Sequence, residues 1–302
     1  MSPMTAAKTP RVSVGMPAYN SERTIQSAID SILSQTFTDL ELIIVDNAST
    51  DGTVALCEAV AARDPRVRVV RNPVNLGVNP NYRKVAQLAT GEFFKWHSTN
   101  DLLDPDYLAA CVAVLEARAD VVLAFGRTVI FQTDPAAGTA YDDRMNADDD
   151  EPLVRFRRTA DLLRLNNAIN GLIRRETLMR TTVHPDYLSS DNIVLSELAL
   201  EGKIVLVPTT RFFRRMDKSS ATALQSTSTV RLAHYPTRKF AQLFQSWRFV
   251  SGYMLAVVRS HLPFAQRMRG LFYCLQLYYW ASPRLFADFK EAVKYYAVKD
   301  RN

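Results

Sequence analysis

An apolar run that passes directly into a polar turn lies about forty residues from the start of the chain. Residues 40–52 read LELIIVDNASTDG. The first six are typical of a strand buried on both faces, and the polar residues after them favour a turn and a helix start. In an open parallel sheet, ligands bind beyond the carboxyl ends of the strands, where helix N-termini converge. This stretch therefore predicts an α/β fold with a ligand site at the turn.

The first 130 residues alternate between strand-like and helix-like patterns. Strands are expected at residues 12–16, 40–45, 67–70, 92–96 and 121–125. Between the first two, Ile25, Ala28, Ile29, Ile32 and Leu33 recur at helical spacing and form one apolar stripe. This alternation predicts stacked β-α units on a mostly parallel sheet flanked by helices.

The pattern of the next hundred residues is less regular. Asp104 and Pro105 predict a helix start, with the acid as cap, for a helix through Leu108, Val112 and Leu115. Residues 134–151 hold a run of acids and predict a mobile, solvated loop in preference to a metal site. Beyond it we expect a helix near 159–165, a strand near 169–174, a helix from Asp191 that ends at Gly202, and strands at 204–207 and 211–213.

Composition narrows the class of protein. With 302 residues and 47% hydrophobic content the chain can bury a sizeable core. Its three cysteines show no metal-ligand spacing, which favours a reducing compartment. Residues 1–11 do not resemble a secretory signal, and the apolar stretch 270–281 is shorter than the roughly 20 residues that span a bilayer. We therefore expect a cytoplasmic protein.

The positive charge of the chain is concentrated near its C-terminal end. Residues 208–302 hold 16 Lys or Arg against four Asp or Glu, although the net charge of the whole chain is only +6. Such a block predicts an anionic partner, either a membrane surface or a lipid-linked phosphate acceptor, with no nucleic acid expected. We expect peripheral attachment to the inner face of the membrane. The predicted contacts are Trp247, Arg248, Phe249, Tyr253, Arg267, Arg269, Leu271, Phe272, Tyr278, Tyr279 and Trp280. The alternative is that these helices pack on the body or form a homodimer face.

Five short motifs follow one another in a fixed order. They are VGMPAYN at 14–20 with Glu22; VDNASTDG at 45–52; Asn72, Asn75, Leu76 and Gly77; GEFFKW at 91–96 leading to Asn100 and Asp101; and Ser190, Asp191 ahead of Glu197, Leu198 and Ala199. Over about residues 11–220 the chain thereby resembles the family-2 glycosyltransferases of the GT-A fold. The resemblance implies an inverting, metal-dependent enzyme of hexosyltransferase type. It would move a sugar from a nucleotide-diphosphate donor, with uridine expected, to a saccharide or lipid-linked hydroxyl in cell-surface polysaccharide or glycolipid assembly.

The resemblance also assigns the nucleotide-binding residues. They are Pro17, Ala18, Tyr19, Asn20, Glu22, Asp46, Asn75 and Asn100. Tyr19 would stack on the base, a contact of about 1 to 3 kcal/mol. Asp46 would accept a hydrogen bond from the base, which is directional because a base without the donor leaves the carboxylate unpaired. The alternatives are a plain strand-ending turn at Pro17 and an Asx-turn at Asp46.

The metal and catalytic positions are assigned in the same way. Asp101 would bind Mg²⁺ or Mn²⁺, although Ser98 and Asn100 stand where relatives often carry further aspartates. Asp191 matches the catalytic base that takes the acceptor proton, with a helix-dipole role as the alternative. A basic cluster would face the diphosphate or form a solvated patch: Arg214, Arg215 and Lys218, with Asp217 where a histidine is common.

The expected organisation is a short tail, a catalytic domain and a helical extension. Residues 1–10 form the tail; 11–220 form the catalytic domain, with a nucleotide half to 103 and an acceptor half from 104; 221–302 form the extension. The reduced metal motif leaves open a second function, a nucleotide-sugar-binding pseudoenzyme that acts as a membrane-associated scaffold. A dehydrogenase is disfavoured because no G-x-G-x-x-G follows the first strand.

Overall fold

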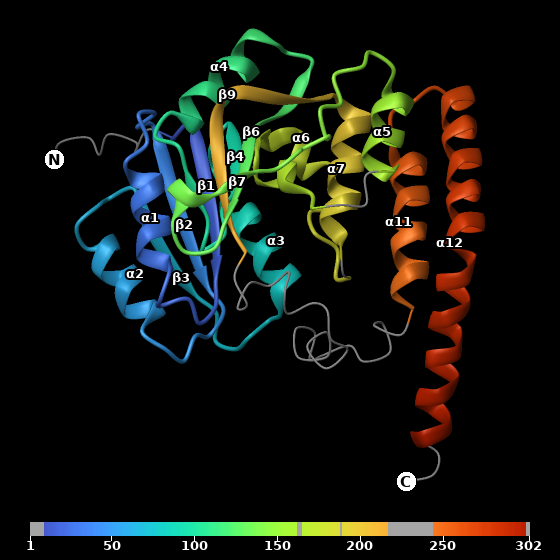
Figure 1. The fold of residues 1–302 in the computed structure, drawn as a ribbon, viewed down its shortest axis with the longest axis horizontal. Coiled ribbons are helices and arrows are strands. Elements are labelled where there is room, and N and C mark those ends of the chain that lie inside the picture. The colour runs from blue at the N-terminus through green and yellow to red at the C-terminus, as the bar shows by residue number, and fades with distance from the viewer. Residues whose placement is uncertain (1–8, 162–164, 188, 217–243, 300–302) are drawn as a thin grey trace, which may run out of the picture.

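A mixed nine-stranded sheet with helices on both faces forms the centre of the molecule (Figure 1). The computed structural model describes residues 9–161, 165–187, 189–216 and 244–299, apart from the side chains of 291 and 294–299. The strands are β1 Val12–Ala18, β2 Leu40–Asp46, β3 Val67–Arg71, β4 Phe93–Trp96, β5 Leu102–Leu103, β6 Val121–Phe131, β7 Thr139–Ala140, β8 Leu172–Arg174 and β9 Lys203–Arg215. The helices are α1 Ile25–Leu33, α2 Thr53–Ala61, α3 Val78–Leu88, α4 Tyr107–Ala117, α5 Pro152–Asp161, α6 Arg175–Met179, α7 Ser190–Glu201, α11 Gln245–Arg259 and α12 Phe264–Lys299, with 3₁₀ turns η1 Pro135–Ala137 and η2 Asn167–Asn170.

The strand order brings the loops after β2, β1 and β4 to one edge of the sheet. The order is β3-β2-β1-β4-β8-β6-β9-β5, and the first four strands are mutually parallel. In the register, Ala18 lies opposite Asp46, and Gly15 lies opposite Trp96. Strand β8 runs antiparallel to β4 and β6, while β9 runs parallel to β6. The expected α/β fold is confirmed, and the predicted ligand edge is formed by three neighbouring strands.

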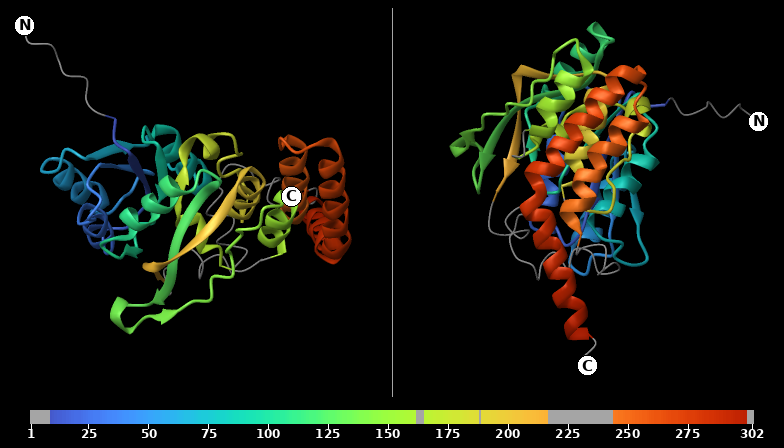
Figure 2. Two further views of the ribbon diagram at one scale, coloured as in Figure 1. Left: turned by 90° about the horizontal axis from the view of Figure 1, so that it is seen from above. Right: turned by 90° about the vertical axis from the view of Figure 1, so that its right-hand side faces the viewer.

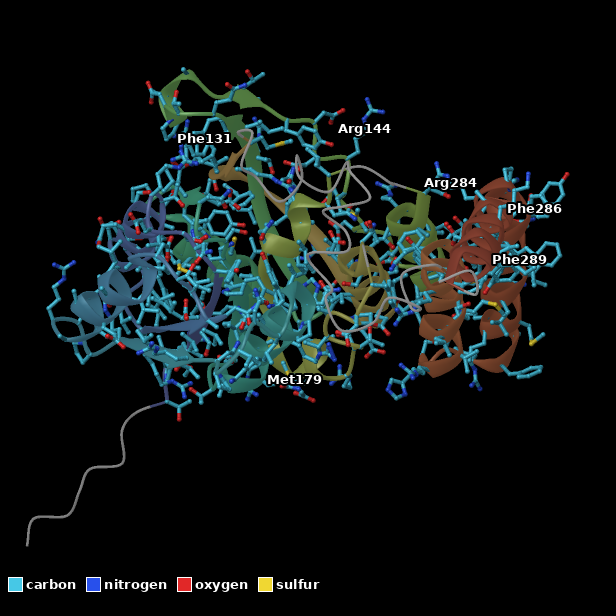
Figure 3. The ribbon with its side chains drawn as sticks, turned by 90° about the horizontal axis from the view of Figure 1, so that it is seen from below. Phe131, Arg144, Met179, Arg284, Phe286 and Phe289 are labelled. Carbon is cyan, nitrogen blue, oxygen red and sulfur yellow. The ribbon has the colours of Figure 1, made fainter. Side chains whose placement is uncertain are left out.

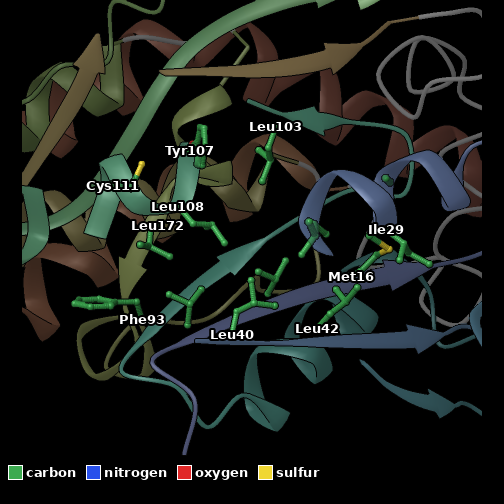
Figure 4. Close-up of a cluster of buried hydrophobic side chains, with 14 of the residues drawn as sticks. Met16, Ile29, Leu40, Leu42, Phe93, Leu103, Tyr107, Leu108, Cys111 and Leu172 are labelled. Carbon is green, nitrogen blue, oxygen red and sulfur yellow. The ribbon is translucent and has the colours of Figure 1, made fainter. Parts of the chain in front are cut away.

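Strand β2 is buried on both faces, as the apolar run of residues 42–45 predicts. Leu42 and Ile44 enter a hydrophobic cluster with α1, α2 and α4 (Figure 4). Ile43 and Val45 enter a second cluster with α3, α6 and α7. Each such side chain contributes about 1.5 to 3 kcal/mol by leaving water, so the sheet is fixed in register where the ligand edge begins.

The C-terminal helices pack against the body of the protein. Helix α11 contacts α7 and α12, and a third cluster joins these helices to α5 through Phe156, Tyr253 and Tyr273 (Figures 1 and 2). A Cβ atom added at Gly252 of α11 would lie 3.0 Å from the Ile193 side chain of α7 and 2.5 Å from the Tyr187 hydroxyl, so α11 lies close to α7 and to the segment before it. Within the described residues, no helix combines the length and apolar character needed to cross a bilayer. The predicted division into domains stays a prediction.

The start of α4 differs from the prediction. The helix begins at Tyr107 with Asp106 as N-cap, two residues after the expected cap. The Asp104 carboxylate instead pairs with Arg211 of β9, at 2.8 Å. Local capping preference therefore gives way to an ion pair between segments that are far apart in the sequence.

The acidic stretch at 134–151 is mostly exposed, as predicted for a solvated loop, and it is also attached to the sheet. That it is mobile stays a prediction. Strand β7 pairs with β6, and Ala147 bridges Ile204. Four of its acids form ion pairs: Asp142 with Arg144, Asp148 with Arg118, Asp149 with Arg158, and Asp150 with Lys203. The charge of the run is thus neutralised by basic residues, three of which lie outside it.

Three further helix or strand boundaries differ from the prediction. Helix α5 begins at Pro152, before the predicted start at 159, because proline suits the first helical turn. The segment expected as a strand from 169 begins as η2 and becomes β8 only at Leu172. The two strands predicted at 204–207 and 211–213 are one strand, β9, with an irregularity opposite Gly126 and Arg127.

Candidate active site

Hydrogen bonds join the loop after β1 to the loop after β2. The Asn20 side-chain oxygen accepts a hydrogen bond from the Thr50 backbone nitrogen at 2.8 Å, and its own backbone nitrogen donates to the Ser49 hydroxyl at 2.9 Å. Glu22 accepts a hydrogen bond from the Gly52 nitrogen at 2.5 Å. Two predicted nucleotide-binding residues, Asn20 and Glu22, therefore hold these loops together. Their direct contact with a nucleotide stays a prediction.

Asp46 lies at the end of β2 with one carboxylate oxygen unsatisfied. The side chain is buried, and its Oδ2 accepts a hydrogen bond from the Ser49 nitrogen at 3.1 Å. Its Oδ1 is buried and has no hydrogen-bond partner. Burying an acceptor without a donor is unfavourable by about 1 to 3 kcal/mol, more for a charged group. A ligand N–H that reaches Oδ1 would remove this penalty.

The loop that begins at the end of β1 supplies an accessible aromatic ring at the same edge of the sheet as Asp46. Ala18 is in register with Asp46, and its carbonyl accepts a hydrogen bond from the Asn47 nitrogen at 2.8 Å. Tyr19, the next residue, is 48% exposed, unlike the buried residues of the strand that leads to it. Pro17, Ala18 and Tyr19 therefore lie at the same edge as Asp46, with the ring available for stacking.

An asparagine network behind this edge was not predicted from the sequence. The buried Asn47 amide donates to Asn75 Oδ1 at 2.9 Å, and Asn72 donates to both Asn47 and Asn81. Asn81 donates in turn to the Val45 carbonyl at 3.0 Å. The predicted nucleotide residue Asn75 is thus a hydrogen-bond acceptor within the network. The density of asparagine between residues 72 and 81 was the available signal.

Asp101 lies in the loop after β4, and this loop is attached to its neighbours. Its Oδ1 accepts a hydrogen bond from the Arg215 backbone nitrogen at 2.9 Å. Thr99 donates to the Ser21 hydroxyl at 2.8 Å, which links the loop to the one after β1. Burial raises the pKa of Asp101, while the positive charge of Arg214 opposes this rise. The Asp46 and Asp101 loops are therefore connected through the loop between them.

A divalent cation fits at Asp101 only if a ligand completes its coordination. The described parts of the chain contain no group of three or more His, Cys, Asp or Glu side chains that could hold a metal. Mg²⁺ and Mn²⁺ accept one or two carboxylates with phosphate oxygens and water as the remaining ligands. His97 is buried, with its Nε2 3.1 Å from the Asp101 carbonyl oxygen. The oxygen set of Asp101 and Asn100 thus fits a cation carried with a diphosphate.

Asp191 lies in the first turn of α7. The N-cap is Ser189, at φ 58°, so the expected cap Ser190 is instead the first helical residue. The Ser190 hydroxyl accepts a hydrogen bond from the Asn79 amide at 3.2 Å and lies 3.3 Å from His184 Nδ1. Burial raises the pKa of Asp191, and the positive charge of Arg214 opposes this rise. Asp191 is therefore a carboxylate of raised basicity on a firmly held helix end.

The two arginines at the end of β9, Arg214 and Arg215, have different partners. Consecutive strand residues point to opposite faces. Arg214 exerts its charge on both Asp101 and Asp191, and its Nη1 donates to Asn167 Oδ1 at 2.5 Å. Arg215 donates to the Asn100 carbonyl at 3.2 Å and to the Gln132 carbonyl at 2.9 Å, which supports a positioning role. The diphosphate role of both stays a prediction, and Lys218 lies outside the described residues.

Strained backbone is confined to the loops that carry these residues. Among the described residues, five non-glycine residues have positive φ: Asn20, Ala48, Val183, His184 and Ser189. They lie in the loops after β1 and β2 and in the segment before Asp191. Such conformations are unfavourable by about 1 to 3 kcal/mol each and cluster at functional sites. The strain coincides with the site defined by Asp46 and Asp191.

A cavity of about 910 Å³ lies elsewhere, between β6, β9 and the β7 hairpin. Its lining includes Arg127, Tyr141, Arg211 and Phe213, and it includes none of the predicted site residues. Arg211 and Phe213 alternate with Arg214 along β9, so they lie on the other face of that strand. The cavity is therefore separate from the candidate site.

Two bacterial proteins each match little more than a third of the chain. EpsE of Bacillus subtilis, provisionally assigned as a glycosyltransferase, is 39% identical over 108 residues, which are 35% of this chain and 39% of EpsE. Chondroitin synthase of Escherichia coli is 35% identical over 120 residues, 40% of this chain and 17% of that protein. The match therefore spans well under two thirds of either relative.

Solved structures share the fold over most of the chain. Staphylococcus aureus TarS, residues 1–349 with UDP-GlcNAc, has a TM-score of 0.63 at 16% identity and covers 89% of this chain and 72% of that one. The mannosyltransferase PcManGT of Pyrobaculum calidifontis, with GDP-Man and Mn²⁺, has a TM-score of 0.55 at 20% identity, covering 95% and 76%. The profile of glycosyl transferase family 2 matches residues 13–181, more than half of the sequence. The chain belongs to glycosyl transferase family 2.

Proposed function

We propose that this protein is an inverting, divalent-metal-dependent glycosyltransferase that moves a sugar from a UDP-sugar to a hydroxyl acceptor. The observation that carries the proposal is Asp46 Oδ1, a buried acceptor without a partner, at the edge of the sheet where the exposed Tyr19 follows the neighbouring strand. A pyrimidine base can donate an N–H from its edge to Asp46 Oδ1 and stack its face on the Tyr19 ring.

Base recognition depends on Asp46 and Tyr19. The N3–H of uracil donates to Asp46 Oδ1, a bond to a charged group that contributes about 1.5 to 3 kcal/mol. Stacking on Tyr19 adds about 1 to 3 kcal/mol. Pro17 and Ala18 line the base pocket, while Asn20, Glu22 and Asn75 keep its loops in place. The UDP-GlcNAc in the TarS structure supports a uridine donor.

The diphosphate lies between Asp101 and Arg214 in this proposal. Asp101, with Asn100 beside it, holds Mg²⁺ or Mn²⁺; when bound, the ion offsets the negative charge that develops on the leaving diphosphate. Arg214 adds a positive charge near both carboxylates, and the proposal retains Lys218 as a further diphosphate contact. The Mn²⁺ in the PcManGT structure supports this choice of ion.

Asp191 acts as the general base. As the acceptor oxygen attacks the anomeric carbon, Asp191 takes the hydroxyl proton, and the bond from that carbon to the diphosphate oxygen breaks on the opposite side. Attack from the opposite face inverts the configuration of the anomeric carbon. Burial strengthens Asp191 as a base by raising its pKa, while Arg214 favours the ionised form that the reaction needs.

The acceptor that we infer is a saccharide or lipid-linked hydroxyl used in cell-surface polysaccharide or glycolipid assembly. The similarity to E. coli chondroitin synthase supports a polysaccharide context. A cytoplasmic enzyme at the inner membrane face would meet both nucleotide sugars and lipid-linked acceptors. Homodimer formation stays an untested prediction.

A transfer assay separates this function from the pseudoenzyme alternative. Purified protein is incubated with UDP-sugars, saccharide acceptors and Mn²⁺, and is compared with Asp191→Asn and Asp101→Asn. Asp142→Asn, a change at an exposed carboxylate of the β7 hairpin, is the matched control. We expect turnover in the wild type and the control only. Donor binding without hydrolysis or transfer under any metal would favour the pseudoenzyme.

A further inference from the structure

Helix α12 has one side packed on the protein and one side exposed. Tyr273, Cys274 and Leu285 are buried on the packed side. On the opposite side, Phe286 and Phe289 point away from the body (Figure 3) and are 61% and 54% exposed. The outer face therefore has no partner among the described residues.

This outer face is a continuous apolar stripe. The residues that form it are Phe264, Met268, Phe272, Leu275, Tyr279, Trp280, Phe286, Phe289 and Val293, each about half to three-quarters exposed. Most of them follow one another at intervals of three or four, the spacing of one helix face. At roughly 150 to 250 Å² per aromatic residue, the six aromatic residues alone expose on the order of 700 Å². A soluble monomer rarely exposes an apolar patch above about 300 to 600 Å², so the outer face of α12 is a candidate interaction surface.

Basic side chains lie beside the stripe: Arg157 and Arg269, together with the acid Glu151, line a pocket with Met268 and Phe272. Between residues 245 and 290 the sequence holds six Lys or Arg and one acid, Asp288. Asp288 is engaged, since its Oδ2 accepts a hydrogen bond from the Ser246 nitrogen at 2.7 Å. The Lys290 ammonium lies 4.9 Å from the Phe286 ring centroid, on the stripe itself. The positive charge beside the stripe therefore favours an anionic partner.

We propose that the outer face of α12 docks on the surface of a bilayer that contains anionic phospholipid, with the helix lying in the plane of the headgroups. Tyr and Trp rings favour the headgroup level, and basic side chains beside an apolar stripe are attracted to anionic lipid. A second copy of the chain would bring like charges together, and the described side chains of α11 and α12 offer no free acid to pair with them. This docking does not depend on the proposed catalytic chemistry.

The structure also corrects the expected set of membrane contacts. Tyr253 is buried, and Phe249 and Leu271 pack against the third cluster, so these three do not face a membrane. Phe272, Tyr279 and Trp280 are on the exposed face as predicted. Sequence reasoning missed Phe264, Met268, Leu275, Phe286, Phe289 and Val293.

Flotation of the full-length protein with vesicles tests the proposal. We expect binding to phosphatidylcholine vesicles that contain phosphatidylglycerol, weak binding to phosphatidylcholine alone, and release by salt. Phe286→Gln with Phe289→Gln should weaken binding at least about tenfold because two apolar contacts are lost. Lys290→Gln should weaken it about fivefold, since the Lys290 ammonium lies over the Phe286 ring of the stripe. Val74→Gln and Arg144→Gln, at exposed positions away from α12, are the matched controls and should bind normally.

Tryptophan quenching locates the contact. The chain has three tryptophans; Trp96 is buried, while Trp247 and Trp280 are 42% and 61% exposed. Brominated lipid should quench the Trp247→Phe variant, which keeps Trp280, more strongly than the Trp280→Phe variant.

Three results would overturn the proposal. They are no binding to the anionic vesicles, binding that the α12 substitutions leave unchanged, and a dimer that these substitutions convert to monomer without any vesicle binding. Light scattering on the same samples reports the last.

Discussion

Replacing Asp46 by Asn changes one atom at the position on which base recognition depends. The amide oxygen of Asn can keep the hydrogen bond from the Ser49 nitrogen, which then places an NH₂ group where Oδ1 stood. The uracil N3–H would meet a donor instead of a charged acceptor. Loss of a hydrogen bond to a charged group weakens binding by about 1.5 to 3 kcal/mol, which is roughly 10- to 150-fold in the dissociation constant of UDP.

Calorimetric titration of UDP into the wild type and Asp46→Asn measures this change. Stability should not fall, because the substitution removes a buried carboxylate oxygen that lacks a partner. CDP serves as the control ligand: cytosine has an acceptor at N3, so the preference for UDP over CDP should decrease in the variant. A folded variant that binds UDP within twofold of the wild type would refute the role of Asp46.

Three further predictions concern catalysis, metal and packing. Asp191→Asn should lower kcat about 100- to 10,000-fold with UDP affinity unchanged. The folded state holds the Asp191 proton more tightly than the unfolded state, so the stability of the wild type falls as pH rises through the raised pKa of Asp191. The variant should therefore be no less stable than the wild type at neutral pH, and a lower denaturant midpoint would contradict this. The kcat/KM of the wild type should increase with pH through that same raised pKa. Asp101→Asn should abolish the gain in UDP affinity on adding Mn²⁺, and a gain that persists in calorimetry would exclude Asp101 as the ligand. Gly252→Ala should lower the free energy of unfolding by about 1 to 3 kcal/mol, since the added Cβ meets the Ile193 side chain of α7 and the Tyr187 hydroxyl, and an unchanged denaturant midpoint would contradict the close α7–α11 packing.

The sequence predicted best the features that depend on local periodicity. The apolar run of β2 alternates between two cores, so it had to be a central strand, and Asp46 followed at its carboxyl end. The stripe of α1 was equally predictable, since Ile25, Ala28, Ile29 and Ile32 are all buried. From these features the edge of the sheet at which the candidate site lies could be predicted.

Features that depend on distant segments could not be predicted. The Asp148 and Asp150 carboxylates pair with Arg118 and Lys203, which are far away in the sequence, so the attachment of the acidic stretch to the body was not predicted. The opposite directions of Arg214 and Arg215 follow because β9 extends to Arg215, whereas the strand predicted from the sequence ended at residue 213. The packed side of α12 became identifiable only once its contacts with α11 were known.

The most direct test of the proposed donor site is a crystal structure of the protein with UDP and Mn²⁺. The account predicts uracil N3 within hydrogen-bond distance of Asp46 Oδ1, the ring stacked on Tyr19, and the ion between Asp101 and the diphosphate. UDP bound elsewhere, or bound with Asp46 Oδ1 still without a partner, would contradict it.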